Sequence, residues 1–342
     1  MLVTILAMGF FVIYLWWSNP FQSLGEVGRF DITLYAIAIA LDYLGLLLFV
    51  ASWYLIIRVL GIQLSFWESI QITFTSLFMG WIAPIPMNTE IVRAYIVKDK
   101  TGSNMGKAIS SVLVHRAYYN IAFGLIVAIA AFTLVLTGRS IPIQTEIVWL
   151  LLTFAIVSSG FFSLVLNPNF LEKIYNKSPA WVKNRIFNKI YDSSKSKSGF
   201  HGFITEIDEA VTNLKANTGL NILAFTFVAA HWFLGTVTTW VVALSMGVHL
   251  DIWITVFIYA TIEFIQQLNW VVPSGLGVVD AGLTAALLLS GVPLSIAAAI
   301  SLLIRFSTNW VELLIYAPVA INYGYLDISK RLKQQDPENI TI

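Results

Sequence analysis

Cysteine is absent from the 342 residues, which excludes disulfides, iron–sulfur clusters and thiol chemistry. Charged residues are also scarce, at 11% of the chain, whereas a soluble domain carries about 25%. No Gly-x-x-x-x-Gly-Lys-Ser/Thr phosphate loop occurs, so the sequence predicts no ATPase of its own. His-Glu-x-x-His motifs, clustered histidines and Asp-x-Asp pairs are missing as well. We therefore expect neither a metal site nor a cofactor.

Hydrophobic residues make up 58% of the chain, and its mean hydropathy is +0.78. Several runs reach about 20 apolar residues, the length of helix that crosses about 30 Å of hydrocarbon. We therefore predict an all-α, polytopic helical protein of the cell membrane, with about eight spans. They are expected at residues 2–17, 32–60, 66–83, 108–136, 147–166, 219–246, 252–272 and 293–323. The first lacks a basic start and a small-residue cleavage site, so we expect a retained helix rather than a signal peptide.

One long polar stretch, residues 167–218, separates the spans into two groups. Its apolar residues recur at helical spacing, around 182–191 and 203–214, which predicts two amphipathic helices on the membrane surface. Recruitment of anionic lipid by their basic residues is the alternative to a purely structural connector. Lysine and arginine gather here, at 93–107 and near the C-terminus, so the positive-inside bias predicts a cytoplasmic C-terminus. The expected organisation is repeat one at 32–166, the connector at 167–218, repeat two at 219–323 and a basic tail at 324–342.

Two stretches interrupt apolar sequence where lipid favours unbroken helix. The first runs Trp81-Ile-Ala-Pro-Ile-Pro-Met-Asn-Thr-Glu90, and the second Asn269-Trp-Val-Val-Pro-Ser-Gly-Leu-Gly-Val-Val-Asp280. Proline lacks a backbone N–H, so breaks of this kind occur inside a membrane only where protein or water satisfies the backbone. We predict that each stretch opens a half-helix or re-entrant element, at about residues 85–107 and 274–290.

The two stretches share the order of their chemical groups. Each reads Trp-x-x-Pro, and a carboxylate follows that proline by six residues in the first (Glu90) and by seven in the second (Asp280). An arginine in apolar sequence follows the carboxylate by 26 residues (Arg116) and by 25 (Arg305). The shared order predicts an internal duplication around a central site, as in many transporters.

These residue types suit an anionic headgroup. Arginine stays charged and offers a fork of donors that fits phosphate oxygens, and broken helices add free backbone N–H groups. The carboxylates offset the positive charge or carry protons; the alternative is that each only pairs with its arginine to hold helices together. We predict substrate binding by Pro84, Pro86, Asn88, Glu90, Arg93, Arg116, Pro273, Ser274, Gly275, Gly277, Asp280 and Arg305. Glu263, Gln267, His115 and Asn120 rank second, and Glu312 ranks below Glu263.

The second stretch also carries a resemblance. Pro-Ser-Gly-Leu-Gly-Val-Val-Asp-Ala-Gly282, followed by Gly291-Val-Pro293 and Arg305, resembles the C-terminal signature of the lysylphosphatidylglycerol synthase transmembrane-region, or flippase-like, family. That signature is Pro-x-Gly-Gly-x-Gly-x-x-Glu-Ala, then Gly-x-Pro and a helix with arginine. Pro86-Met-Asn-Thr-Glu-Ile-Val-Arg93 resembles its first motif, Gly-Glu-x-x-Arg, which Ser-Val and Glu-Arg follow. Thr89, His115, Asn120 and Asp280 depart from the pattern, of which Asp280 keeps the carboxylate.

The resemblance implies lipid-headgroup translocation. We expect a translocator of an anionic phospholipid or a polyprenyl-phosphate-linked headgroup, and not an enzyme. The soluble aminoacyl-transferase domain of the family's synthases is expected to be absent. The expected partners are a membrane lipid or lipid-linked sugar and an enzyme that makes or uses it, with no nucleic acid. The alternatives are an integral-membrane glycosyltransferase, with Glu26, Asp31 or Glu90 as the base, and an accessory subunit of a lipid-linked glycan or aminoacyl-lipid pathway.

Overall fold

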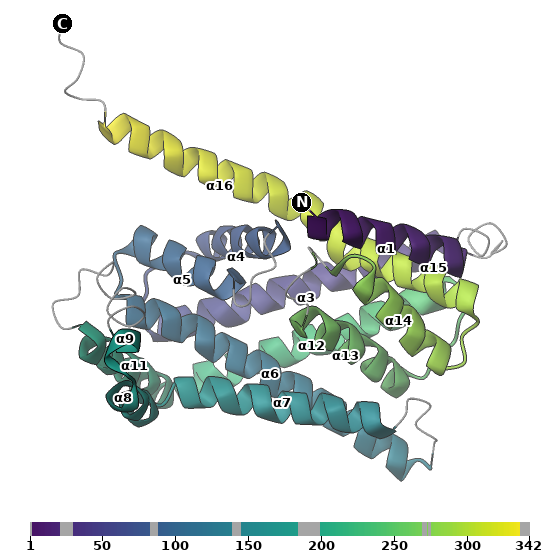
Figure 1. Cartoon of the computed structure of the whole chain (residues 1–342), viewed down its shortest axis with the longest axis horizontal. Helices are drawn as coiled ribbons and strands as arrows, with labels where there is room; N and C mark the ends of the chain where they lie inside the picture. Colours follow the sequence, from purple (N-terminus) through teal and green to yellow (C-terminus); the bar gives the residue numbers. More distant parts are fainter. Residues whose placement is uncertain are drawn as a thin grey trace, which may run out of the picture.

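The computed structural model describes residues 2–20, 30–82, 88–138, 145–183, 199–268, 272 and 275–335 (Figure 1). This part of the chain is helical throughout, with short connections. The first half contains α1 Leu2–Ser18, α3 Ile32–Val59, α4 Phe66–Ile82, α5 Asn88–Thr101, α6 Met105–Leu136 and α7 Thr145–Val165. After them come α8 Pro168–Lys177, α9 Ala180–Val182, α11 Gly199–Ala216, α12 Thr218–Ser245, α13 Ile252–Leu268 and α14 Val278–Leu289. The last elements are α15 Leu294–Arg305, the π-helical segment η3 Phe306–Trp310 and α16 Val311–Gln335.

Five helices in the described chain are long and apolar enough to cross a membrane. They are α3, α6, α12, Glu146–Val165 of α7 and the continuous rod Leu294–Gly324 formed by α15, η3 and α16. The other three expected spans, α1, α4 and α13, have 17 residues each. At 1.5 Å per residue this is about 26 Å, short of the about 30 Å of hydrocarbon. The helical membrane class is confirmed, with five helices of full span length in the described chain and α1, α4 and α13 as shorter apolar helices.

Helices α4 and α13 each form an antiparallel hairpin with the helix that follows, α5 and α14. In the first hairpin Lys100, at the end of α5, pairs with Glu68, at the start of α4, at 2.8 Å. In the second, Gly282 near the start of α14 packs so closely on Ile265, near the end of α13, that a Cβ would collide with it. Figure 1 shows the α4–α5 and α13–α14 hairpins in opposite halves of the molecule. Half-helices were therefore correctly predicted on both sides.

The longest contact in the bundle is the antiparallel pair α3 and α12. Gly45 lies against His231. Hydrogen bonds run from Ser52 Oγ to the Ala224 carbonyl at 2.7 Å and from Thr238 Oγ1 to the Ala38 carbonyl at 3.5 Å. The three contacts are evenly spaced along both helices and run in opposite directions, which fixes the antiparallel register.

This register has the pattern of a two-fold axis. Helices α3 and α12 have 28 residues each, and α4 and α13 have 17 each, with the same offset in sequence between the members of both pairs. Under that offset Gly45 corresponds to His231, the residue it touches, and the two hydrogen-bonded pairs exchange equivalent positions. An axis perpendicular to two membrane-crossing helices lies in the membrane plane, as in transporters with inverted repeats. The exact repeat bounds remain a prediction.

The described part of the connector contributes α8, the short α9 and α11 at one end of the bundle (Figure 1). Helix α11 buries Phe203, Ile207 and Leu214. Its Glu206 carboxylate accepts the Gly106 N–H at 2.7 Å, so α11 docks on the start of α6. The helix expected around 182–191 lies largely outside the described residues, while α8 forms earlier, at Pro168. Within the expected basic tail, 324–342, α16 continues as helix to Gln335, and the residues after it lie outside the described chain.

Candidate functional site

A cavity of about 610 Å³ lies between the two hairpin tips. Thr89 and Glu90 from the first interrupted stretch and Gly275 from the second line it together. The wall also includes residues from α3, α6, α7, α12, α13 and α16. Its charged lining in the described chain consists of Asp42, Glu90, Glu263, Glu312, Arg93 and Arg116. The two stretches thus meet at one polar cavity inside an apolar bundle.

Arg116 joins the two halves at this cavity. Its Nε lies 3.5 Å from Glu90 Oε1 on α5, and its Nη2 donates to Gln267 Oε1 on α13 at 3.2 Å. The guanidinium also stands over the Tyr119 ring, 5.1 Å from its centroid. The side chain is 28% exposed and that of Glu90 15%, so this ion pair is open to the cavity. Arginine and carboxylate here remain accessible to a third group.

Arg93 is the more unusual cation. The residue is 2% exposed, and its guanidinium packs near the rings of Phe49 and Trp53, at 5.4 and 5.0 Å from their centroids. Its Nε donates to Ser76 Oγ at 3.4 Å. Among the residues the structure describes, no carboxylate forms an ion pair with Arg93, because Glu90 pairs with Arg116 instead. A buried positive charge that forms no ion pair with a described carboxylate lies at the cavity wall.

His115 completes the basic side of the cavity. Its Nδ1 lies 3.3 Å from Arg93 Nη1, and arginine can only donate, so Nδ1 accepts. The imidazole is then neutral and carries its proton on Nε2. Within the described chain that buried Nε2–H makes no hydrogen bond of ordinary geometry, although the Phe49 backbone lies close to the ring. Arg93, Arg116 and His115 together offer donors in excess of their protein acceptors.

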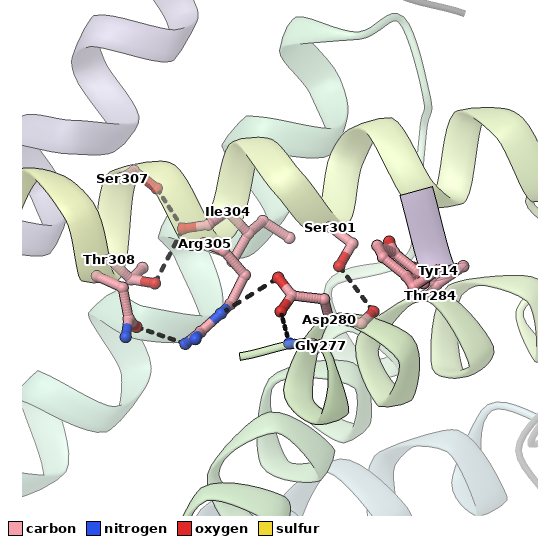
Figure 2. Close-up of polar contacts among 10 residues, drawn as sticks. Tyr14, Gly277, Asp280, Thr284, Ser301, Ile304, Arg305, Ser307 and Thr308 are labelled. Carbon is pink, nitrogen blue, oxygen red and sulfur yellow. Dashed lines mark hydrogen bonds and ion pairs between the residues drawn. The ribbon is translucent and has the colours of Figure 1, made fainter. Parts of the chain in front are cut away.

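Asp280 and Arg305 form an ion pair that, unlike the Glu90–Arg116 pair, is almost completely buried (Figure 2). Their closest atoms, Asp280 Oδ1 and Arg305 Nε, are 3.4 Å apart, and each side chain is 3% exposed. Asp280 Oδ2 accepts the Gly277 N–H at 2.8 Å, which caps the start of α14, and Arg305 Nη1 donates to Asn309 Oδ1 at 2.6 Å. Neither Asp280 nor Arg305 lines the cavity. Arg116 therefore lines the cavity and Arg305 does not, and substrate binding by Arg305 stays a prediction.

Helix α1 seals this second pair. The Tyr14 hydroxyl lies 2.8 Å from Thr284 Oγ1, beside Asp280 in Figure 2. Gly277 has a φ of +79°, and a Cβ there would collide with Phe10. The position therefore requires glycine twice over, for its left-handed backbone and for the close approach of α1.

The remaining predicted residues divide into three groups. Glu263 accepts the Tyr119 hydroxyl at 2.8 Å, and Gln267 binds Arg116, so both second-rank residues belong to the cavity. Asn120 donates to the Arg116 carbonyl at 3.0 Å and supports its helix from within. Outside the described residues lie Pro84, Pro86, Pro273 and Ser274, and for Asn88 only the backbone is described.

Sequence reasoning missed Asp42. It is the one acidic residue of α3, within an otherwise apolar run, and it lines the cavity. Glu312 on α16, which the sequence placed below Glu263 in rank, lines the same cavity. A lone carboxylate in an apolar span was the available signal.

The chain matches the profile of the family described as the lysylphosphatidylglycerol synthase TM region over residues 4–315. It is similar to a UPF0104 membrane protein of Methanothermobacter thermautotrophicus, with 25% identity over 296 residues that cover 84% of this chain and 83% of the relative. A UPF0104 membrane protein of Pyrococcus horikoshii is 22% identical over 324 residues, 92% of this chain and 94% of the relative. No solved structure matches the chain. The matched range includes both interrupted stretches and both arginines.

Proposed function

Because the chain belongs to the lysylphosphatidylglycerol synthase TM region family, as its motifs predicted, we propose that it moves an anionic lipid headgroup across the bilayer. The substrate class is a phospholipid or polyprenyl phosphate, with a phosphate that the cavity arginines bind. The acyl or prenyl chains stay in the surrounding lipid while the headgroup passes the hairpin tips. Consistent with the distribution of basic residues, we place the protein in the cell membrane with its C-terminus in the cytoplasm.

Arg93 carries this proposal. An ionised side chain inside a membrane costs at least about 2.5–3.5 kcal/mol and normally faces a counter-charge or a wet cavity. Arg93 is buried at the cavity and pairs with none of the described carboxylates. A phosphate oxygen supplies an ion-pair partner for Arg93 and a hydrogen-bond acceptor for His115 Nε2.

The size and position of the cavity support the same substrate class. About 610 Å³ lies within the range of small-molecule sites, about 300–1,000 Å³. Both hairpins end at it, so a headgroup there contacts both halves of the molecule. Contact with both halves at one central site is the arrangement that alternating access requires.

The transferase alternative gains no support from its proposed bases. Asp31 Oδ1 accepts the N–H groups of Thr33 and Leu34 and caps α3, which is a structural task. Glu90 is held by Arg116, and Glu26 lies outside the described residues. We therefore retain translocation as the proposed function.

The test uses purified protein in liposomes with a fluorescent phosphatidylglycerol whose outer-leaflet fraction is bleached by dithionite. The wild type is expected to speed movement between leaflets, and Arg93→Gln to slow it by at least about tenfold, since a charge-assisted hydrogen bond contributes about 1.5–3 kcal/mol. Arg58→Gln is the matched control, because Arg58 is exposed at the far end of α3. Wild-type protein that moves no anionic lipid, or that consumes a sugar donor without such movement, would contradict the proposal.

A further inference from the structure

Two apolar side chains of the cavity wall also lie on the outer surface of the bundle. Phe161 on α7 and Leu268 at the end of α13 line the cavity, and the exposed fractions of the two residues are 53% and 50%. Helix α7 runs along the outer edge of the bundle (Figure 1). Both helices are apolar, so hydrocarbon surrounds this face of the protein. The cavity therefore opens sideways to lipid between α7 and α13.

Helices α7 and α13 run in the same direction, because each is antiparallel to α6. On the side of α7, Ala117 of α6 packs with Phe162, and Gly124 further along α6 lies against Ala155. The two hydrogen bonds from α6 to α13, described above, are reversed in order in the same way. Residues later in α7 and later in α13 therefore lie toward the same end of the bundle.

The two helices touch next to the opening. The Phe154 ring of α7 packs edge-on against the Phe264 ring of α13, with their centroids 5.0 Å apart. Phe161 lies seven residues beyond Phe154, and Leu268 lies four residues beyond Phe264. At 1.5 Å per residue these separations along the two helices are about 10 Å and about 6 Å. The ring contact thus closes the wall at one end, and the opening lies beyond it.

Arg116 lies at the level of the opening. Phe162, next to Phe161, packs on the turn of α6 that carries Arg116. Gln267, next to Leu268, accepts a hydrogen bond from Arg116 Nη2 at 3.2 Å. The Arg116 side chain is itself 28% exposed. An anionic group that enters between α7 and α13 therefore reaches a guanidinium at the same depth of the membrane.

We infer that the opening between Phe161 and Leu268 is the lateral entrance of the cavity, where a hydrocarbon chain of the bound lipid lies while its phosphate reaches Arg116. This inference rests on the proposed function and names the route by which the substrate enters. An amphiphile fits both surfaces, because a charged headgroup needs polar partners inside a membrane whereas its chain needs none. The apolar rim contacts the chain, and the arginine behind it binds the phosphate.

The first test blocks the entrance. The chain has no cysteine, so Phe161→Cys and Leu268→Cys each introduce a single target for pyrene maleimide. Each variant is purified and reconstituted, and its lipid movement is measured before and after labelling with the dithionite assay. The label should slow the movement by at least about tenfold, because a lipid must enter before it can cross. The same folded sample serves before and after, so misfolding cannot cause the loss.

The matched control is Ile156→Cys. Ile156 is on the same helix, is 72% exposed and does not line the cavity. The label there contacts bulk lipid only, so it should change lipid movement by less than about twofold.

The second test detects lipid at the entrance without requiring transport. Phosphatidylglycerol and phosphatidylcholine, each brominated on the acyl chains, quench the pyrene in proportion to their local concentration. At position 161 phosphatidylglycerol should be enriched by about fivefold over phosphatidylcholine, because a net negative lipid is drawn to a nearby arginine. The preference should disappear at position 156, and also at position 161 when Arg116→Gln is added.

The two tests separate the inference from the proposed function. If the wild type moves lipid, unchanged movement after labelling at 161 and 268 together with equal quenching by the two lipids would overturn the entrance and leave the function in place. If the wild type moves no lipid, the proposed function fails. Preferential quenching at 161 would then still support the opening as a lipid-binding site, and equal quenching would remove it as well.

Discussion

The two acid–arginine sets differ although their sequences follow one order. Glu90 and Arg116 are partly exposed at a cavity, with a second arginine, Arg93, beside them. Asp280 and Arg305 are each 3% exposed and are enclosed by backbone and side-chain hydrogen bonds. The spacing of charges brings both arginines to the tips of the hairpins. The helices that pack against each ion pair then decide whether its side chains are partly exposed or buried.

Helix α1 is the packing element that makes the difference. It places Phe10 against Gly277 and Tyr14 against Thr284, and so covers the start of α14. The start of α5 instead borders the cavity, where Thr89 and Glu90 line the wall. We therefore regard the second pair as a clasp that holds α14 to α15 and the first as part of the proposed headgroup site.

The largest expected effect is on the clasp. Arg305→Ala leaves Asp280 buried and unpaired, which should lower the free energy of unfolding by about 3–5 kcal/mol. Arg116→Ala removes a partly exposed pair and should lower it by less than about 1 kcal/mol, while slowing lipid movement. Thermal unfolding in detergent measures the first quantity and the liposome assay the second.

A double substitution tests the comparison directly. Replacing both members, Asp280→Leu with Arg305→Met, removes the unpaired charge and should recover most of the stability lost in Arg305→Ala. A double variant that folds and still moves lipid would establish the pair as structural. One that folds but moves no lipid would place Arg305 in the binding machinery after all and would end the distinction between the two sets.

The next largest effect is expected where α1 packs on the start of α14, next to the Asp280–Arg305 pair. Gly277→Ala forces an L-residue to a φ of +79° and drives its Cβ into Phe10, which should destabilise the protein by about 1–3 kcal/mol. Gly138→Ala is the matched control, because Gly138 also has a positive φ but no atom within 4 Å of a built Cβ. It should lose about 1 kcal/mol. Equal losses in thermal unfolding for the two variants would mean that α1 does not pack tightly on α14.

Much of the fold could be predicted because hydropathy and chain-breaking residues act locally. The apolar runs predicted the ends of α3, α6 and α12 to within about three residues, the usual uncertainty of helix bounds. Proline and glycine in the interrupted stretches predicted where α4 and α13 stop. The expected span 66–83 differs from α4 by one residue, and the expected span 252–272 extends past Leu268 into residues outside the described chain.

The site was predicted less completely because burial and pairing depend on distant segments. Sequence spacing treats Arg116 and Arg305 alike, since the cover over Arg305 comes from α1, at the other end of the chain. Asp42 lines the cavity together with Glu312, which lies on the last helix. A lone acid in an apolar run signals a partner but does not identify it.

The smallest expected effect is at the connector, far from either set. Burial raises the pKa of Glu206, and the hydrogen bond from the Gly106 N–H opposes that shift only in part. A raised pKa in the folded state means that the folded protein binds the proton more tightly than the unfolded chain. The contribution of Glu206 to stability is therefore fully present below its ordinary pKa, and it is lost as the pH rises through the raised value.

Glu206→Gln should remove this pH dependence of the free energy of unfolding and change that free energy by less than about 1 kcal/mol. Thermal unfolding of both proteins across the acidic range measures it, and parallel pH profiles would show that Glu206 titrates alike in the folded and unfolded chain.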